Sequence, residues 1–167
     1  MCRMSDKPQE NSTHLESVDS PDSEELLAML HQASQEQAAG NMAEAEQAYE
    51  KIAELDPNNK FATQLLGGLA FQKGDFHRAQ EFITKALVVD PNNAELNSNL
   101  GNALVKLRRF DEAVQHFNQA LAIQPGYASA HNGLGAALRE QGNPKEALEH
   151  HIKALEGQPD NPRVRNN

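Results

Sequence analysis

The chain has no tryptophan, a single cysteine, Cys2, and no run of apolar residues long enough to cross a membrane. One cysteine cannot form an intramolecular disulfide or a cysteine-based metal site. Residues 1–21 contain no apolar stretch that could serve as the core of a signal peptide. The sequence therefore gives no support for secretion or membrane insertion, and we expect a cytoplasmic protein.

Basic residues are also scarce, with 15 lysines and arginines against 24 acids and a net charge of −9. Nucleic-acid binding depends on clustered Lys and Arg, so we do not expect a nucleic-acid partner. The acids are concentrated in the polar amino-terminal segment, which has almost no large apolar residues. Because such a segment cannot bury enough surface to offset its ordering entropy, we expect residues 1–19 to be a disordered acidic leader.

The seven histidines do not form a recognisable catalytic or metal-binding pattern. His150 and His151 are adjacent and point to different faces of a helix, and His116 lies one repeat before His150 at an equivalent surface position. A glycine-rich phosphate loop and a nucleophile elbow are both missing. We therefore expect no enzyme active site, no metal site and no cofactor within these residues.

A 34-residue period runs through the sequence. Pro57, Pro91, Pro125 and Pro159 are each 34 residues apart, and all four follow Asp or Gln. A fixed period of this length is typical of an array of identical supersecondary units.

Each unit is predicted to contain two amphipathic helices separated by a short break. Gly40-Asn41, Gly74-Asp75 and Gly142-Asn143 place a helix-closing glycine before a helix-capping residue. Asn41 with Glu44, and Asn143 with Glu146, resemble capping boxes with Asn in place of Ser or Thr. The third unit has Arg108-Arg109 at this place, which predicts a strained corner.

Small residues recur at the same period and predict a close helix crossing within each unit. Large apolar residues at helical spacing surround them and predict the core. The small residues are Ala33, Gly67, Gly101, Gly135, Ala45, Ala79, Ala113 and Ala147; the large ones are Leu66, Leu100, Leu134, Tyr49, Ile83 and Phe117.

Asn99-Leu100-Gly101, Phe110-Asp111-Glu112-Ala113, Ala120-Leu121 and Pro125 together resemble the tetratricopeptide repeat. The resemblance covers residues 26–161 as four units, at about 26–59, 60–93, 94–127 and 128–161. The first unit is degenerate, with Gln32 and Glu36 at places where the family prefers apolar residues. Ser20-Pro21-Asp22 supplies a start signal for its first helix.

This resemblance implies an all-α fold, a right-handed superhelical solenoid of antiparallel helix pairs whose first helices line the concave side. Asn99 is similar to the inward-facing asparagines of the O-GlcNAc transferase type of array, although Leu65 and Gly133 interrupt such a ladder. Some members of the family bind chaperone C-termini through a cationic clamp. Of the clamp positions, here Gln64, Gly68, Asn99, Ser129 and Gly133, only Asn99 matches.

The resemblance predicts a protein-interaction module that binds an extended peptide or partner protein in its concave groove. Asn side chains can hold a peptide backbone, and exposed Phe and Leu offer apolar contacts. The alternative is the substrate-recruiting arm of a larger enzyme, of the glycosyltransferase or sulfotransferase type. The candidate groove residues are Phe61, Gln64, Leu65, Phe71, Asn99, Asn102, Lys106, Asn132 and Arg139.

Residues 162–167 align with the start of a fifth repeat, which predicts that the chain is cut inside a helix. The packing surface of the fourth unit, around Leu148, His151 and Leu155, would then stay open to water. We expect this end to fray or to pair end to end with another molecule.

Overall fold

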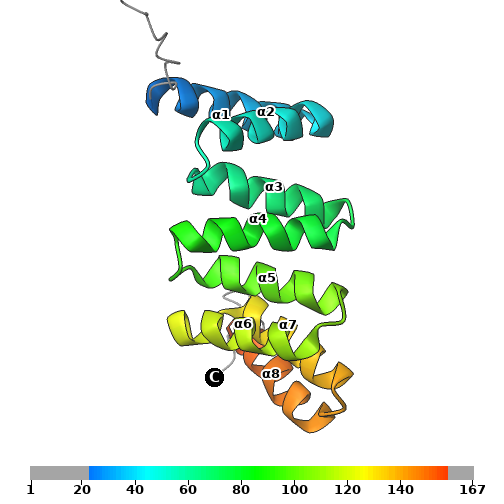
Figure 1. The fold of residues 1–167 in the computed structure, drawn as a ribbon. Helices are drawn as coiled ribbons and strands as arrows, with labels where there is room; N and C mark the ends of the chain where they lie inside the picture. Colours follow the sequence, from blue (N-terminus) through cyan, green and yellow to red (C-terminus); the bar gives the residue numbers. More distant parts are fainter. Residues whose placement is uncertain (1–22, 158–167) are drawn as a thin grey trace, which may run out of the picture.

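The structure, a computed structural model, describes residues 23–157. The expected leader, the Ser20-Pro21-Asp22 start signal and the expected fifth repeat, at 162–167, lie outside these residues. Within them the chain forms α-helices and no strand, and successive helices pair antiparallel and stack (Figure 1). The helices are α1 (Ser23–Ala39), α2 (Met42–Leu55), α3 (Lys60–Gln72), α4 (Phe76–Val89), α5 (Ala94–Lys106), α6 (Phe110–Ile123), α7 (Ala128–Glu140) and α8 (Pro144–Glu156).

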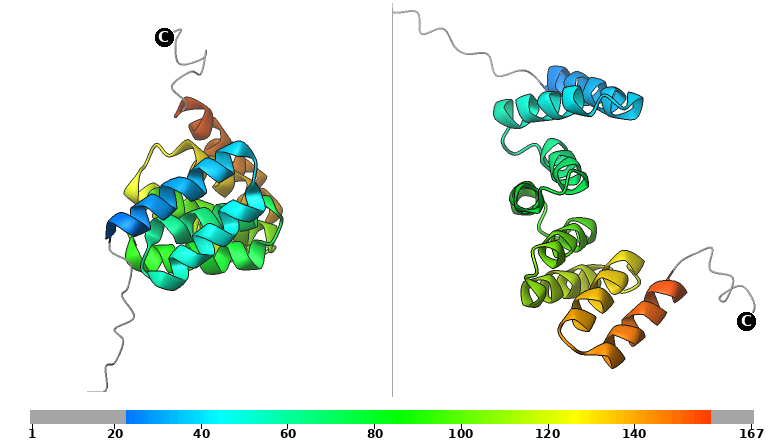
Figure 2. Two further views of the ribbon diagram at one scale, coloured as in Figure 1. Left: turned by 90° about the horizontal axis from the view of Figure 1, so that it is seen from above. Right: turned by 90° about the vertical axis from the view of Figure 1, so that its right-hand side faces the viewer.

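The stack is curved. In the right-hand view of Figure 2, α3 and α5 lie on the inner side of the curve, and α4 and α6 lie on the outer side. This is the right-handed superhelical solenoid of helix pairs that the sequence predicted, and the fold prediction is confirmed.

Close helix crossings hold each pair together. A Cβ added to Gly67 would lie 2.7 Å from Cγ1 of Ile83, and one on Gly101 would lie 2.7 Å from Cε1 of Phe117. At these two crossings the small residue therefore faces a large side chain of the second helix. At the crossing of α7 and α8 two small residues meet, since a Cβ on Gly135 would lie 2.9 Å from the carbonyl oxygen of Ala147.

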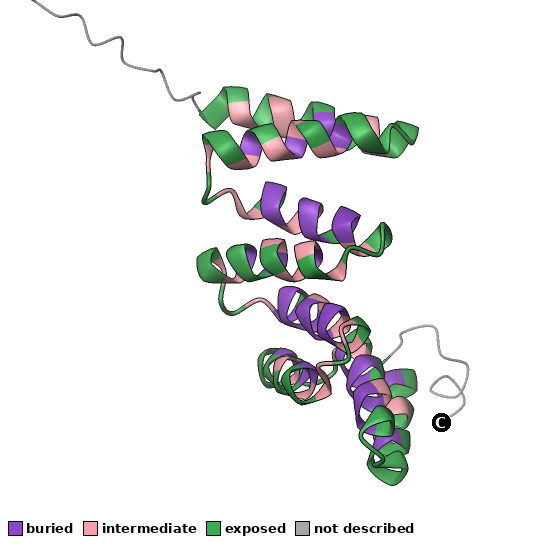
Figure 3. Cartoon of the chain, turned by 45° about the vertical axis from the view of Figure 1, so that its right-hand side comes forward, coloured by how far each residue is buried: buried purple, intermediate pink, exposed green. Residues whose placement is uncertain are grey.

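The buried residues form two clusters. The smaller one joins α1, α2 and α3 around Tyr49, Ile52 and Leu66. The larger one runs from the end of α3 to α8 around Leu100 and Phe117. Figure 3 shows that buried residues are concentrated on α3, α5 and α7, whereas α1 has only Ala33 buried. The first unit contributes least to the core, which agrees with its degenerate sequence.

The turns inside the pairs share one backbone conformation. The φ angles are 88° at Gly40, 80° at Gly74 and 84° at Gly142. Arg108 takes the same place in the third pair with φ 60°, and it is the only non-glycine residue with positive φ among the described residues. Because a Cβ is strained in this region, the prediction of a strained corner at Arg108 is confirmed.

The helix caps differ in part from the prediction. The Asp75 carboxylate accepts a hydrogen bond from the backbone N–H of Arg78 at 3.1 Å, as expected. Asn41 and Asn143 make no side-chain cap bond, so the two capping boxes with Glu44 and Glu146 are wrong. The amide of Asn41 instead donates to Oε2 of Glu36 at 2.7 Å, across the turn.

The caps that do form on the first helices follow the Asp-Pro-Asn-Asn turns. Asn59 Oδ1 accepts from the backbone N–H of Ala62 at 3.1 Å, and Asn93 Oδ1 accepts from that of Leu96 at 3.0 Å. Each Asn also donates to the Asp that opens its turn, at 3.2 Å for Asp56 and 3.1 Å for Asp90. These bonds fix the path of the chain into α3 and α5.

Polar bonds also join each pair to the next. Arg78 on α4 contacts Glu46 and Glu50 on α2, the first at 3.1 Å. Nη1 of Arg109 donates to Oε1 of Gln80 at 2.7 Å. These bonds link neighbouring pairs near the starts of their second helices, and they help to set the spacing between units.

Candidate functional site

A hollow of about 200 Å³ lies between α3 and α5 on the inner side of the curve. Its floor is apolar and includes Ile83 and Leu96, which are 3% and 1% exposed. Its rim consists mainly of side-chain amides. The lining residues are Gln64, Gly67, Gly68, Phe71, Gln72, Ile83, Leu96, Asn99 and Asn102.

Four of the nine candidate groove residues line this hollow: Gln64, Phe71, Asn99 and Asn102. The Phe71 ring packs edge-on against the Phe76 ring, with centroids 5.3 Å apart, so the wall that it forms is fixed from behind. No ionisable side chain is among the lining residues. The hollow can therefore accept an apolar side chain, while the amides can pair with a peptide backbone.

Phe61 and Leu65 lie on α3 outside the hollow. Phe61 is 55% exposed, and the Nζ atom of Lys60 lies 5.5 Å from the centroid of its ring. Leu65 is half-buried and packs against the core cluster of α1, α2 and α3.

The three remaining candidates, Lys106, Asn132 and Arg139, are exposed on α5 and α7. Asn132 accepts a hydrogen bond from Nδ1 of His151 at 3.1 Å. Arg139 lies 3.7 Å from the carboxylate of Glu140. The structure thus brings four candidates together around one hollow and distributes the other five along α3, α5 and α7.

Sequence reasoning missed two features of this hollow. At Gly68 the sequence indicates only a mismatch to the chaperone clamp. The missing side chain does not by itself predict a hollow, because the space beside Gly133 on α7 is filled by Phe117. Ile83 was assigned to the core, where it belongs, but the same side chain also forms the floor.

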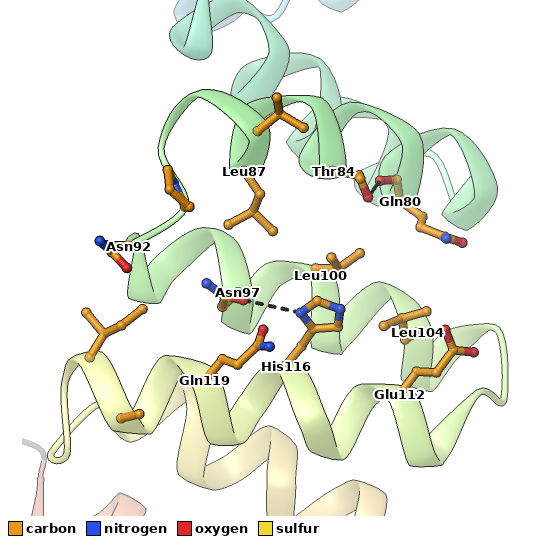
Figure 4. Close-up of a pocket in the computed structure, with 14 residues that line it drawn as sticks. Gln80, Thr84, Leu87, Asn92, Asn97, Leu100, Leu104, Glu112, His116 and Gln119 are labelled. Carbon is orange, nitrogen blue, oxygen red and sulfur yellow. Dashed lines mark hydrogen bonds between the residues drawn. The ribbon is translucent and has the colours of Figure 1, made fainter.

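A second, wider cleft of about 610 Å³ lies on the outer side, between α4 and α6, with α5 at its base (Figure 4). Leu100 and Leu104 lie at its base, and Thr84 and Gln119 stand on its walls. His116 points from α6 toward Asn97 on α5, with 3.2 Å between its Nδ1 and Oδ1 of Asn97.

The environment of His116 disfavours its charged form. Burial lowers its pKa from the ordinary 6.5, although a hydrogen bond to Gln119 and the charge of Glu112 act in the opposite direction. The sequence predicts equivalent surface positions for His116 and His150, and both are intermediate in exposure, partly buried against the neighbouring helix.

His150 contacts the buried His131, which occupies the place of Asn97 one repeat later in the chain. His131 is 8% exposed, and its Nε2 lies 2.9 Å from the carbonyl oxygen of Pro125, to which it donates. Its Nδ1 therefore accepts from Nδ1 of His150, 3.0 Å away. Burial lowers the pKa of His150, and the neighbouring His131 and Lys153 lower it further.

Within residues 23–157, no group of three or more His, Cys, Asp or Glu side chains is placed to hold a metal ion. Over the same span, none of the helices combines the length and apolar character needed to cross a bilayer.

Two tetratricopeptide-repeat models match the sequence, one over residues 36–98 and the other over residues 92–160. The chain therefore contains tetratricopeptide repeats. A search of curated protein sequences found no match.

Solved structures of MamA share this fold. MamA MSR-1 superposes with a TM-score of 0.71 at 27% sequence identity, over 84% of this chain and 79% of that one. MamA from Desulfovibrio magneticus RS-1 gives a TM-score of 0.75 at 18% identity, over 85% of this chain and 78% of that one. A further MamA crystal structure gives 0.73 at 23% identity, over 79% and 77%.

Proposed function

We propose that this protein is an interaction module that holds an extended peptide segment of a partner along the inner face of its helical stack. The hollow between α3 and α5 carries the proposal, because four of the candidate residues meet there around an apolar floor. Tetratricopeptide repeats in general serve as protein-interaction scaffolds, and this supports the reading. The five other candidate residues would extend the contact along α3, α5 and α7.

The same proposal includes the division into repeat units, the type of array and the cellular compartment. The repeats divide the chain into four units at about 26–59, 60–93, 94–127 and 128–161, and the array is of the O-GlcNAc transferase type. The protein acts in the cytoplasm as a scaffold or adaptor without catalysis of its own.

Removal of two rim amides tests the proposal. Random dodecapeptides displayed on phage are selected on the full chain, and the affinities of the selected peptides are measured by fluorescence polarisation. Asn99→Ala with Asn102→Ala should weaken binding by about thirtyfold, because each of the two lost hydrogen bonds contributes roughly 1 kcal/mol. Helicity in circular dichroism should stay unchanged, since both side chains lie at the rim.

The matched control removes two exposed amides from α6, Gln115→Ala with Asn118→Ala, and should leave the affinity as it is. If the selected peptides bind the Asn99, Asn102 double variant as tightly as the control, or if no peptide is selected, the groove proposal is wrong.

The alternative remains the recruiting arm of a larger enzyme. Both readings use the same groove, so the peptide assay does not separate them. The reading frame of the gene beyond Asn167 does, because a catalytic domain there would make this segment a recruiting arm.

A further inference from the structure

The hollow between α3 and α5 is lined by three positions that differ from their counterparts in the next repeat. Gly68 stands where α5 has Asn102, and Asn99 stands where α7 has Gly133, 34 residues later in each case. Ile83 likewise stands where α6 has the larger Phe117. Between α5 and α7 the equivalent space is closed. A Cβ added to Gly133 would lie 2.3 Å from Cζ of Phe117 and 3.1 Å from Oδ1 of Asn102.

The preceding step of the stack is closed as well. Ser34 on α1 is the counterpart of Gly68, and it accepts a hydrogen bond from the hydroxyl of Tyr49 at 3.3 Å. Leu65, the counterpart of Asn99, packs into the core cluster beside it. A glycine on one helix, an amide on the next and the smaller Ile83 at the floor therefore distinguish this step of the described stack from the two others.

The size and chemistry of the opening define what fits it. A Cβ at Gly68 would meet no atom within 4 Å, so the space above this helix is empty. At about 200 Å³ the hollow is smaller than the roughly 300–1,000 Å³ of small-molecule sites, but it has room for one side chain. A charged group there would lose water without gaining an ionic partner, because the lining is uncharged.

We propose that this hollow is an anchor pocket for one large apolar side chain of an extended partner segment. Ile83, Leu96 and Phe71 surround the anchor. The amides at the rim pair with the backbone on either side of it. The proposal rests on the groove function above and adds to it the place and the chemistry of the residue that decides affinity.

Gly68→Leu tests the pocket by filling it from within. The dodecapeptides selected on the wild-type chain should share one large apolar residue with uncharged neighbours. Their affinity for Gly68→Leu should be about tenfold to a hundredfold weaker, because burial of one such side chain contributes that much. Replacement of the shared residue by Ala in the peptide should produce a similar loss on the wild-type chain and little further loss on Gly68→Leu.

A second substitution at Gly68 serves as the control for effects on folding. Gly68→Ala should melt no lower than the wild type, since the added methyl group meets open space and alanine favours the helix. Gly126→Leu, at an open position in the turn after α6, is the matched control for an added apolar side chain and should bind normally.

The outcomes separate the two proposals. Normal binding to Gly68→Leu with weakened binding to the Asn99, Asn102 double variant keeps the groove and overturns the pocket. A shared charged residue in the selected peptides also overturns the pocket. Normal binding to all variants overturns both proposals. A synthetic peptide of residues 1–22 that binds tighter than the selected peptides would reassign the hollow to the chain's own leader.

Discussion

At the scale of single residues, one backbone conformation with positive φ closes the first helix of every pair. Glycine takes this conformation in three pairs, and Arg108 takes it in the third pair along the chain. In the second pair the N–H of Gly74 bonds to the carbonyl of Phe71 at 3.0 Å, and the N–H of Asp75 bonds to that of Ala70 at 2.9 Å. In the third pair Arg108 and Arg109 make the same two bonds at 3.0 Å and 2.9 Å. The turn is preserved without glycine, so the strain is carried by Arg108.

Arg108→Gly should relieve this strain. We expect the free energy of unfolding to be about 1 kcal/mol higher for Arg108→Gly than for Arg108→Ala, as measured by urea denaturation. The alanine variant is the proper reference, because both substitutions remove the guanidinium that lies 5.3 Å from the centroid of the Phe110 ring. Gly74→Ala should be destabilising by a similar amount. Equal stability of the two Arg108 variants would show that the corner is not strained.

At this scale the sequence predicts a feature when the feature depends only on residues adjacent in the chain. The corner at Arg108 was predictable, because the repeat itself assigns a glycine there. The side-chain caps at Asn41 and Asn143 were not. Their ψ angles are 65° and 63°, against 95° and 112° at the capping Asn59 and Asn93, and the residue type alone does not fix this angle.

At the scale of helices, the periodic sequence predicted the helix pairs. It predicted less about the hollow and the buried polar residues that lie between neighbouring helices. Helix positions follow from apolar spacing and from the Gly and Pro signals. The hollow beside Gly68 is formed by residues of two units, since Ile83 comes from the second unit and Leu96 from the third, so it follows only once both units are placed. The buried polar column of Thr63, Asn97 and His131 recurs every 34 residues, but hydrophobic periodicity does not detect polar residues.

The histidines between helices predict a pH dependence of stability. The folded state lowers the pKa values of His116 and His150 below the ordinary 6.5, so protonation favours the unfolded chain. Stability should be highest above about pH 7 and should fall as the pH drops below the ordinary histidine pKa of 6.5. Urea denaturation at several pH values measures this slope.

The variant that tests the origin of this slope is His116→Gln with His150→Gln, which should flatten it. His77→Gln, at an exposed position on α4, should keep the wild-type slope. Asp90 and Glu112 do not interfere, since their pKa values are lowered from 3.8 and 4.5, and the stability that they contribute is lost only at lower pH. An unchanged slope in the double variant would contradict the assignment.

At the scale of the whole molecule, each pair packs against its neighbours along the stack. The two end pairs therefore have one packing face each without a neighbouring pair among the described residues. On α8, Leu148 is 61% exposed and Ile152 is 47% exposed. Their counterparts two repeats earlier, Gln80 and Thr84, line the cleft against the next unit. On α1, Leu27 is 67% exposed.

These two apolar ends predict end-to-end association. A contact between the α8 face of one molecule and the α1 face of another joins different surfaces, so it leaves two free faces and can propagate. Sedimentation equilibrium should show a mass that rises with protein concentration beyond the dimer. Leu148→Glu with Ile152→Lys should restore a monomer, because charged side chains would be desolvated in the contact.

Glu149→Lys with Lys145→Glu, at exposed positions on the same helix, preserves net charge as the control and should associate like the wild type. A wild-type chain that stays monomeric at all concentrations, or association that survives the α8 substitutions, would show that this face is not the contact.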